Sequence, residues 1–111
     1  MTTFDEREKG FERKFAHDEQ LRFKATARRN KLFGLWAAGL MGLSGEDAQE
    51  YAKSVVKANF EGPGDADVLR KVRTDLEAKG VDQSEQQLES TLIEFMAEAV
   101  SQIQADSGTK S

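Results

Sequence analysis

Apolar residues recur every three or four positions in four stretches of the chain, which is the spacing of one face of an α-helix. The stretches cover residues 18–44, 45–60, 65–80 and 84–106. No segment alternates apolar and polar residues with the period of a strand, and the connections between the stretches are short. The pattern therefore predicts an all-α protein, a four-helix bundle built from residues 18–106.

Residues that favour helix ends stand at the borders of the later stretches. Ser84 and Gln87 have the spacing of a capping box, in which each side chain bonds the backbone of the other. Asp65 or Asp67 can cap the start of the third helix. Gly80 can end it in a left-handed conformation.

The first predicted helix is the longest and the most apolar. Its run of apolar residues, 32–43, is too short for a membrane span, which needs about 20 residues. We therefore expect this run to belong to the central helix of the bundle, with Trp36 in the core. Gly34, Gly39 and Gly42 would allow other helices to approach closely. The apolar face that the spacing predicts contains Leu21, Ala25, Leu32, Leu35, Trp36, Gly39, Leu40 and Leu43.

The stretch FDEREKGFERKF, residues 4–15, combines a narrow apolar stripe with many charges. In a helix, Phe4, Phe11 and Phe15 fall within about 40° of one another. Gly10 interrupts this short helix, and an isolated helix of this length is marginal in water. We expect a flexible, partly helical segment, residues 1–17, that orders when its stripe meets a groove in a partner.

Charge and composition limit the classes of function. The net charge of −4 combines +3 in residues 1–31 with −7 in residues 32–111, so a general nucleic-acid binder is not expected. The chain has no cysteine and one histidine, His17, so we expect no zinc site. His17 is interpreted as structural or as a pH-sensitive group. No apolar leader follows Met1, and a cytoplasmic protein is expected.

Cationic residues cluster on the first predicted helix, and two interpretations stay open. The stripe can be a solvated face that pairs with the acidic later helices. Alternatively, it can bind phosphate groups weakly in a soluble nucleotide-sensing bundle for ATP or ADP, although no glycine-rich phosphate loop is present. The sequence has no catalytic triad or paired-carboxylate motif, so we expect a binding or regulatory protein without a cofactor. The residues of the stripe are Lys24, Arg28, Arg29 and Lys31.

Two blocks of the chain carry a family resemblance, KFAHDEQLRFKATARRNKLFGLWAA (14–38) and GEDAQEYAKSVVKANFEGPGDADVLRKVRTDL (45–76). In residues and in order, they resemble the ζ subunit family of α-proteobacterial F-type ATP synthases. With the opening MTTFDEREKGFE, the resemblance covers about the first three-quarters of the chain. Asn59 and Gly62 depart from it, because acidic residues are usual there.

The resemblance implies a four-helix inhibitor of ATP hydrolysis by F1. Its N-terminal segment, residues 1–17, would enter a catalytic α/β interface beside the γ subunit, with residues 18–106 as the bundle and 107–111 as a disordered tail. The partners would be the α, β and γ subunits of F1 at the cytoplasmic face of the membrane, without membrane insertion, and the free protein would be a monomer. The apolar anchors would be Phe4, Phe11 and Phe15, and the residues pairing with carboxylates would be Arg7, Lys9, Arg13 and Lys14.

Overall fold

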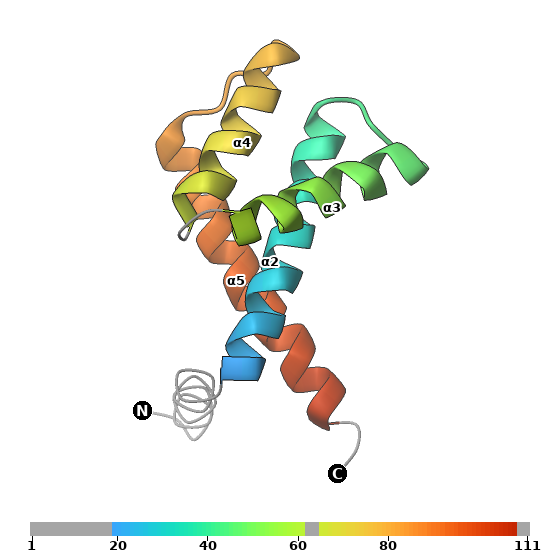
Figure 1. The fold of residues 1–111 in the computed structure, drawn as a ribbon, viewed down its shortest axis with the longest axis vertical. Helices are drawn as coiled ribbons and strands as arrows, with labels where there is room; N and C mark the ends of the chain where they lie inside the picture. Colours follow the sequence, from blue (N-terminus) through green and yellow to red (C-terminus); the bar gives the residue numbers. More distant parts are fainter. Residues whose placement is uncertain (1–18, 62–64, 109–111) are drawn as a thin grey trace.

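The computed structural model describes residues 19–61 and 65–108. They form four helices, α2 (Glu19–Leu40), α3 (Gly45–Glu61), α4 (Asp65–Ala78) and α5 (Glu85–Gly108) (Figure 1). The described residues contain no strand, so the predicted all-α fold with four helices is confirmed. Helix α5 continues two residues beyond the predicted end of the bundle at residue 106. The predicted N-terminal segment lies outside the described residues.

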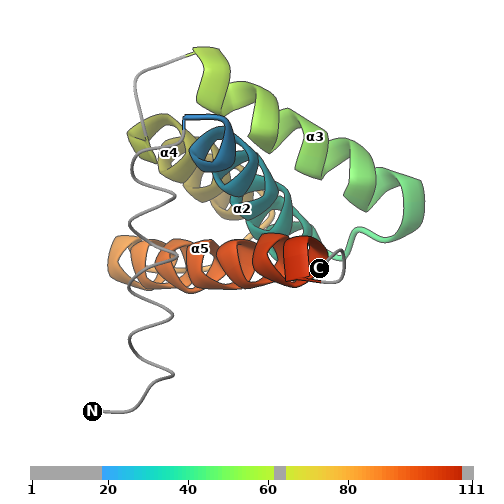
Figure 2. The ribbon, with the colours of Figure 1, turned by 90° about the horizontal axis from the view of Figure 1, so that it is seen from below.

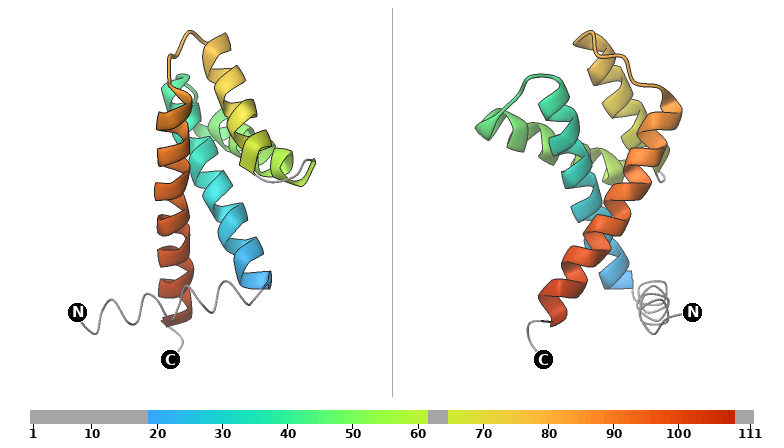
Figure 3. Two further views of the ribbon diagram at one scale, coloured as in Figure 1. Left: turned by 90° about the vertical axis from the view of Figure 1, so that its left-hand side faces the viewer. Right: turned by 180° about the vertical axis from the view of Figure 1, so that it is seen from behind.

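Helix α2 lies in the middle of the molecule. Seen along the bundle, α5 covers one side of α2, and α3 and α4 cover the other (Figure 2). Helices α4 and α5 run in opposite directions, whereas α3 lies across α2 (Figures 1 and 3). Helix α5 packs chiefly against α2 and only slightly against α4. One long face of α5 is therefore left uncovered by the other three described helices.

The helix ends follow the local signals in the sequence. Gly80, after α4, has φ +74°, and Gly42, after α2, has φ +80°. After each glycine, the next N–H donates to the carbonyl five residues earlier at 2.9 Å, as in a Schellman motif. The capping box at α5 is formed, with 3.0 and 3.1 Å between the side chains and backbone nitrogens of Ser84 and Gln87.

Two clusters of buried side chains form the described core. The smaller cluster joins Ala25 of α2 to Ile103 of α5, with Leu21, Met96 and Val100 packed against it. The larger one draws on all four helices, and removing its apolar side chains from water stabilises the bundle. Its members are Phe33, Ala37, Val55, Val68, Val72, Leu76, Leu88 and Leu92.

The predicted apolar face of α2 is partly wrong. Leu21, Leu32 and Leu35 are only half-buried, and Leu40 is 39% exposed. Because α2 has neighbours on both sides, its closest contacts are made by small residues, and the larger leucines lie at the edges. The apolar side chains and glycine that α2 buries are Ala25, Phe33, Gly34, Ala37 and Ala38.

Trp36 is half-buried and packs against the larger cluster. Its ring stacks on Phe33 with centroids 5.6 Å apart, and it meets Phe95 of α5 edge-on at 6.5 Å. The prediction that Trp36 lies in the core is therefore confirmed in part: the ring packs against the core cluster, but part of the side chain is exposed at the surface.

Among the three glycines predicted to allow close packing, Gly34 has that role. A Cβ at Gly34 would lie 2.8 Å from the Cα of Ala52, so α3 crosses α2 almost backbone to backbone at this point. A Cβ at Gly39 would meet no atom of the described residues within 4 Å, and Gly42 lies in the turn after α2. The prediction for Gly39 and Gly42 is wrong, because α3 has already diverged from the end of α2.

Candidate functional site

The structure separates the cationic residues that the sequence places on one stripe. Lys24 and Lys31 are exposed, Arg28 is half-buried, and Arg29 is only 4% exposed. Lys24, Arg28 and Lys31 keep the four- and three-residue spacing that places them on one side of α2. Arg29 lies apart from them, turned into the molecule.

Arg29 joins α2 to the first residue of α4. Its Nη2 donates to the Oδ1 of Asp65 at 2.8 Å and to the Oδ1 of Asn30 at 2.9 Å, and its Nε donates to the same Asn30 oxygen at 3.0 Å. Asn30 is completely buried, and its Nδ2 has no hydrogen-bond partner among the described residues. The guanidinium is thus engaged in holding two helices together, and a phosphate would have to displace these contacts.

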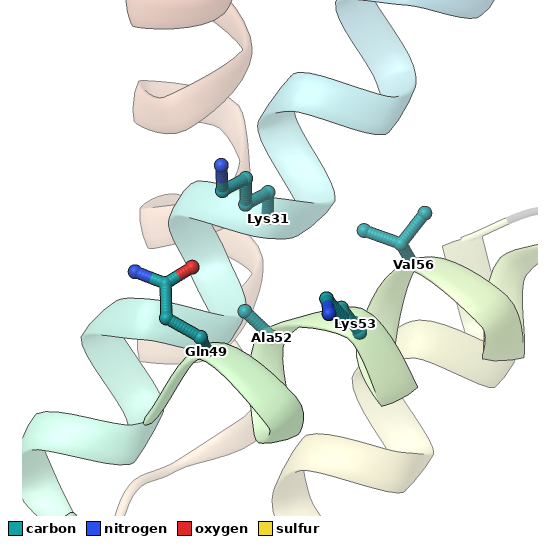
Figure 4. Close-up of a pocket in the computed structure, with 5 residues that line it drawn as sticks. All are labelled: Lys31, Gln49, Ala52, Lys53 and Val56. Atoms are coloured by element: carbon teal, nitrogen blue, oxygen red, sulfur yellow. The ribbon is translucent and has the colours of Figure 1, made fainter. Parts of the chain in front are cut away.

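A shallow pocket of about 220 Å³ lies between α2 and α3, beside Lys31 (Figure 4). Lys31 comes from α2, and Gln49 and Lys53 come from α3, with Ala52 and Val56 supplying apolar walls. The ammonium group of Lys53 also lies 3.6 Å from a carboxylate oxygen of an exposed glutamate one turn earlier. Two ammonium groups and an amide around a partly apolar hollow suit a small organic anion.

Gln49 and Lys53 were not among the candidates from the sequence. On α3 they belong to the polar side of an amphipathic helix, where charged residues are ordinary. Only the packing of α3 across Gly34 brings them beside Lys31, and this crossing depends on tertiary contacts. Sequence reasoning had no signal for it.

A second polar group joins α3 to α4. The hydroxyl of Tyr51 donates to the Oδ2 of Asp75 at 2.8 Å, and Lys71 donates to the same oxygen at 3.1 Å while lying 5.3 Å from the Tyr51 ring centroid. Burial raises the pKa of Tyr51 well above its ordinary value, and the hydrogen bond to Asp75 and its negative charge raise it further. This arrangement keeps Tyr51 protonated and links the two helices.

Within residues 19–61 and 65–108, no three potential metal ligands are grouped. The same residues include no helix that is long and apolar enough to cross a membrane. His17 and the predicted F1-binding residues lie outside the described part of the chain. Those binding residues, which stay predictions, are Phe4, Arg7, Lys9, Phe11, Arg13, Lys14 and Phe15.

Comparison with known proteins gives a family match and a solved relative. Residues 1–102 match the family described as ATPase inhibitor subunit zeta. A protein of known solution NMR structure is 45% identical, with a TM-score of 0.69, and the match covers 78% of this chain and 98% of that one. No curated protein sequence matches the chain significantly.

Proposed function

Because the chain belongs to the ATPase inhibitor subunit zeta family, we propose that its N-terminal segment, residues 1–17, blocks ATP hydrolysis at a catalytic α/β interface of F1 beside the γ subunit. The family is one of regulatory subunits, and its partner is the F1 ATPase complex. The observation that carries the proposal is the extent of the match, which begins at residue 1 and includes this segment together with the helices.

The chemistry of the segment supports insertion into a protein groove. Burying Phe4, Phe11 and Phe15 would contribute roughly 1.5–3 kcal/mol each, less the free energy of ordering the segment. The basic residues beside the stripe would pair with carboxylates of the F1 subunits, and these surface pairs would weaken with added salt. A helix wedged beside a rotating subunit would stop rotation in the hydrolytic direction. We place this interaction at the cytoplasmic face of the membrane-bound synthase, with a monomeric free protein.

Deleting residues 1–14 tests the proposal directly. The described core clusters involve residues between Leu21 and Ile103, so the bundle should fold without these residues. We expect inhibition of cognate F1 to be lost while the melting temperature changes little. A control that lacks residues 109–111 should inhibit like the full chain. Full inhibition by the N-terminal deletion, with its bundle intact, would disprove the role of the segment.

A narrower variant separates the stripe from the rest of the segment. Replacing Phe4 and Phe11 with alanine removes apolar contact and keeps every charge. We expect this double variant to need a much higher concentration for half-inhibition. Replacing Thr2 with alanine, outside the stripe, serves as the control.

The pocket beside Lys31 supports a second candidate function, weak binding of ATP or ADP. Lys31 and Lys53 would hold the phosphates, and the walls of Ala52 and Val56 would contact the base or ribose. Titrating each nucleotide while following amide chemical shifts tests this. Shifts should centre on Lys31 and Lys53 and disappear in the Lys53→Ala variant, whereas Lys57→Ala, an exposed position on the same helix, should change nothing. No shift at millimolar nucleotide would refute it.

A further inference from the structure

The side of α2 that its neighbours leave open is basic. Helices α5, α4 and α3 contact α2 at Ala25, Arg29 and Gly34, respectively. At 100° per residue, these three positions span about half of the circumference of α2. The other half contains three basic residues within about 60° of one another, and we call them the basic ridge. They are Lys24, Arg28 and Lys31.

The two lysines of the ridge lack a counter-charge in the described part of the chain. Every basic residue of α4 forms an ion pair at 3.1–3.5 Å, and Arg29 pairs with Asp65 at 2.8 Å. Within residues 19–61 and 65–108, neither Lys24 nor Lys31 forms such a pair. The pairing with later helices that the sequence suggested is therefore seen for Arg29 and not for these two lysines.

The spacing of the ridge works against its own helix. Lys24 and Lys31 stand four and three residues from Arg28, and like charges at these spacings destabilise a helix. Both lysines are exposed, so their ammonium groups are accessible to another molecule. A partner that supplies negative charge along the ridge would remove this repulsion.

The shape and the surroundings of the ridge favour a protein as that partner. Lys24 and Lys31 are about 10 Å apart along α2, which is longer than one phosphate group. Helix α2 holds five basic residues and one acidic residue, whereas its neighbour α5 holds five acidic residues and no basic one. An extended polyanion or an anionic membrane would meet the acidic helix as well as the ridge and be repelled. A local row of carboxylates on a protein surface would not.

The ridge begins close to the proposed inhibitory segment. Residue 17, where that segment ends, is two positions before Glu19, the first residue of α2. Lys24 lies about 8 Å along α2 from Glu19, and Lys31 lies about 10 Å further. A segment held in F1 would therefore bring Lys24 nearest to the surrounding subunit surface, with Lys31 farther from it.

We propose that the basic ridge of α2 binds a row of carboxylates on the F1 subunits that border the inserted segment. The proposal rests on the proposed function, because insertion of residues 1–17 determines which end of α2 meets F1. Carboxylates accept hydrogen bonds from ammonium and guanidinium groups, and complementary charge across an interface chiefly raises the association rate. The ridge would thus guide the segment to its groove and fix the orientation of the bundle on the complex.

The test reverses one charge at a time in the full-length protein and follows the onset of F1 inhibition. In low salt, we expect Lys24→Glu to slow association about fivefold and Lys31→Glu about twofold, and both effects should shrink in high salt. Lys79→Glu makes the same change in net charge in the exposed turn after α4, far from the start of α2 (Figure 1), and should have no effect. Lys24→Glu should stay folded, since an acidic residue four positions before Arg28 favours the helix.

Three outcomes would overturn the proposal. If Lys24→Glu and Lys31→Glu inhibit as rapidly as the unmodified protein, the ridge does not contact F1, even when deletion of residues 1–14 abolishes inhibition. Equal slowing by all three variants would show an effect of net charge alone. Sedimentation of the free protein with vesicles of phosphatidylglycerol and phosphatidylcholine, lost in Lys24→Glu, would assign the ridge to a membrane.

Two comparisons separate this proposal from the others. Full inhibition by the protein that lacks residues 1–14 would refute the proposed function itself. Lys31 also borders the pocket between α2 and α3, whereas Lys24 does not. Slower association in Lys24→Glu therefore supports the contact with F1 independently of any nucleotide in that pocket.

Discussion

The same glycine-to-alanine change should have opposite effects at two positions of α2. At Gly34 an added Cβ would lie 2.8 Å from the Cα of Ala52 and 3.2 Å from a methyl carbon of Val55. At Gly39 it would meet nothing within 4 Å in the part of the chain that the structure describes. Both glycines are helical without a positive φ, so the two variants differ mainly in their tertiary surroundings.

The expected free energies follow from two opposing contributions. Alanine favours a helix over glycine by about 1 kcal/mol, and somewhat less near a helix end such as Gly39. At Gly34 the extra methyl group must push away the backbone of α3, and overpacking of this kind costs about 1–3 kcal/mol. We therefore expect Gly39→Ala to stabilise the protein by about 0.5 kcal/mol and Gly34→Ala to destabilise it by about 1 kcal/mol.

Urea unfolding followed by helical circular dichroism measures both values, and thermal unfolding checks them at roughly 4 °C per kcal/mol. Gly34→Val should be worse than Gly34→Ala, since the larger side chain has the same close backbone neighbour. A Gly34→Ala protein at least as stable as the unmodified chain would refute the close crossing of α2 and α3 as a constraint on the fold.

Two other predictions concern the polar links between helices. Arg29→Met should destabilise the protein by roughly 1–3 kcal/mol in urea unfolding, because it removes the donor to the buried Oδ1 of Asn30. Adding Asn30→Leu should recover part of this loss, because it removes the buried amide as well. A further loss of stability in the double variant would contradict the prediction. Tyr51, the single tyrosine, has a pKa raised above its ordinary value, so its contribution to stability is complete below the unfolded-state pKa and falls as the pH rises above it. Tyrosinate absorbance should appear only at unusually high pH and move toward lower pH in Asp75→Asn; ordinary titration in the folded protein would refute the link.

Local features of the chain were predictable because they depend on neighbours in sequence. The capping box at Ser84 and the left-handed glycine at Gly80 involve residues within one turn, and both are formed. The buried positions of α4 and most of those of α5 also follow the three- and four-residue spacing, since each of these helices buries mainly one side.

Helix α2 shows where this reasoning fails. Its position between two layers gives it more than one buried side, so the largest apolar residues no longer mark the core. The buried Arg29 pairs with Asp65, which lies 36 residues later in the sequence. No local sequence pattern indicates that pairing. The pocket at Lys31 depends likewise on the crossing of α3 at Gly34.

The pairing of α2 with α5 has a consequence for the order of folding. These are the first and last described helices, and 44 residues, 41–84, separate them, whereas only residues 41–44 separate α2 from α3. Closing the longer loop costs roughly 2 kcal/mol more in chain entropy. During synthesis, moreover, the contacts of Ala25 with Ile103 must wait until nearly the whole chain has left the ribosome. The half of α2 nearest the N-terminus should therefore acquire its native partners last, and it should be the first part to open when the C-terminal end of α5 is shortened.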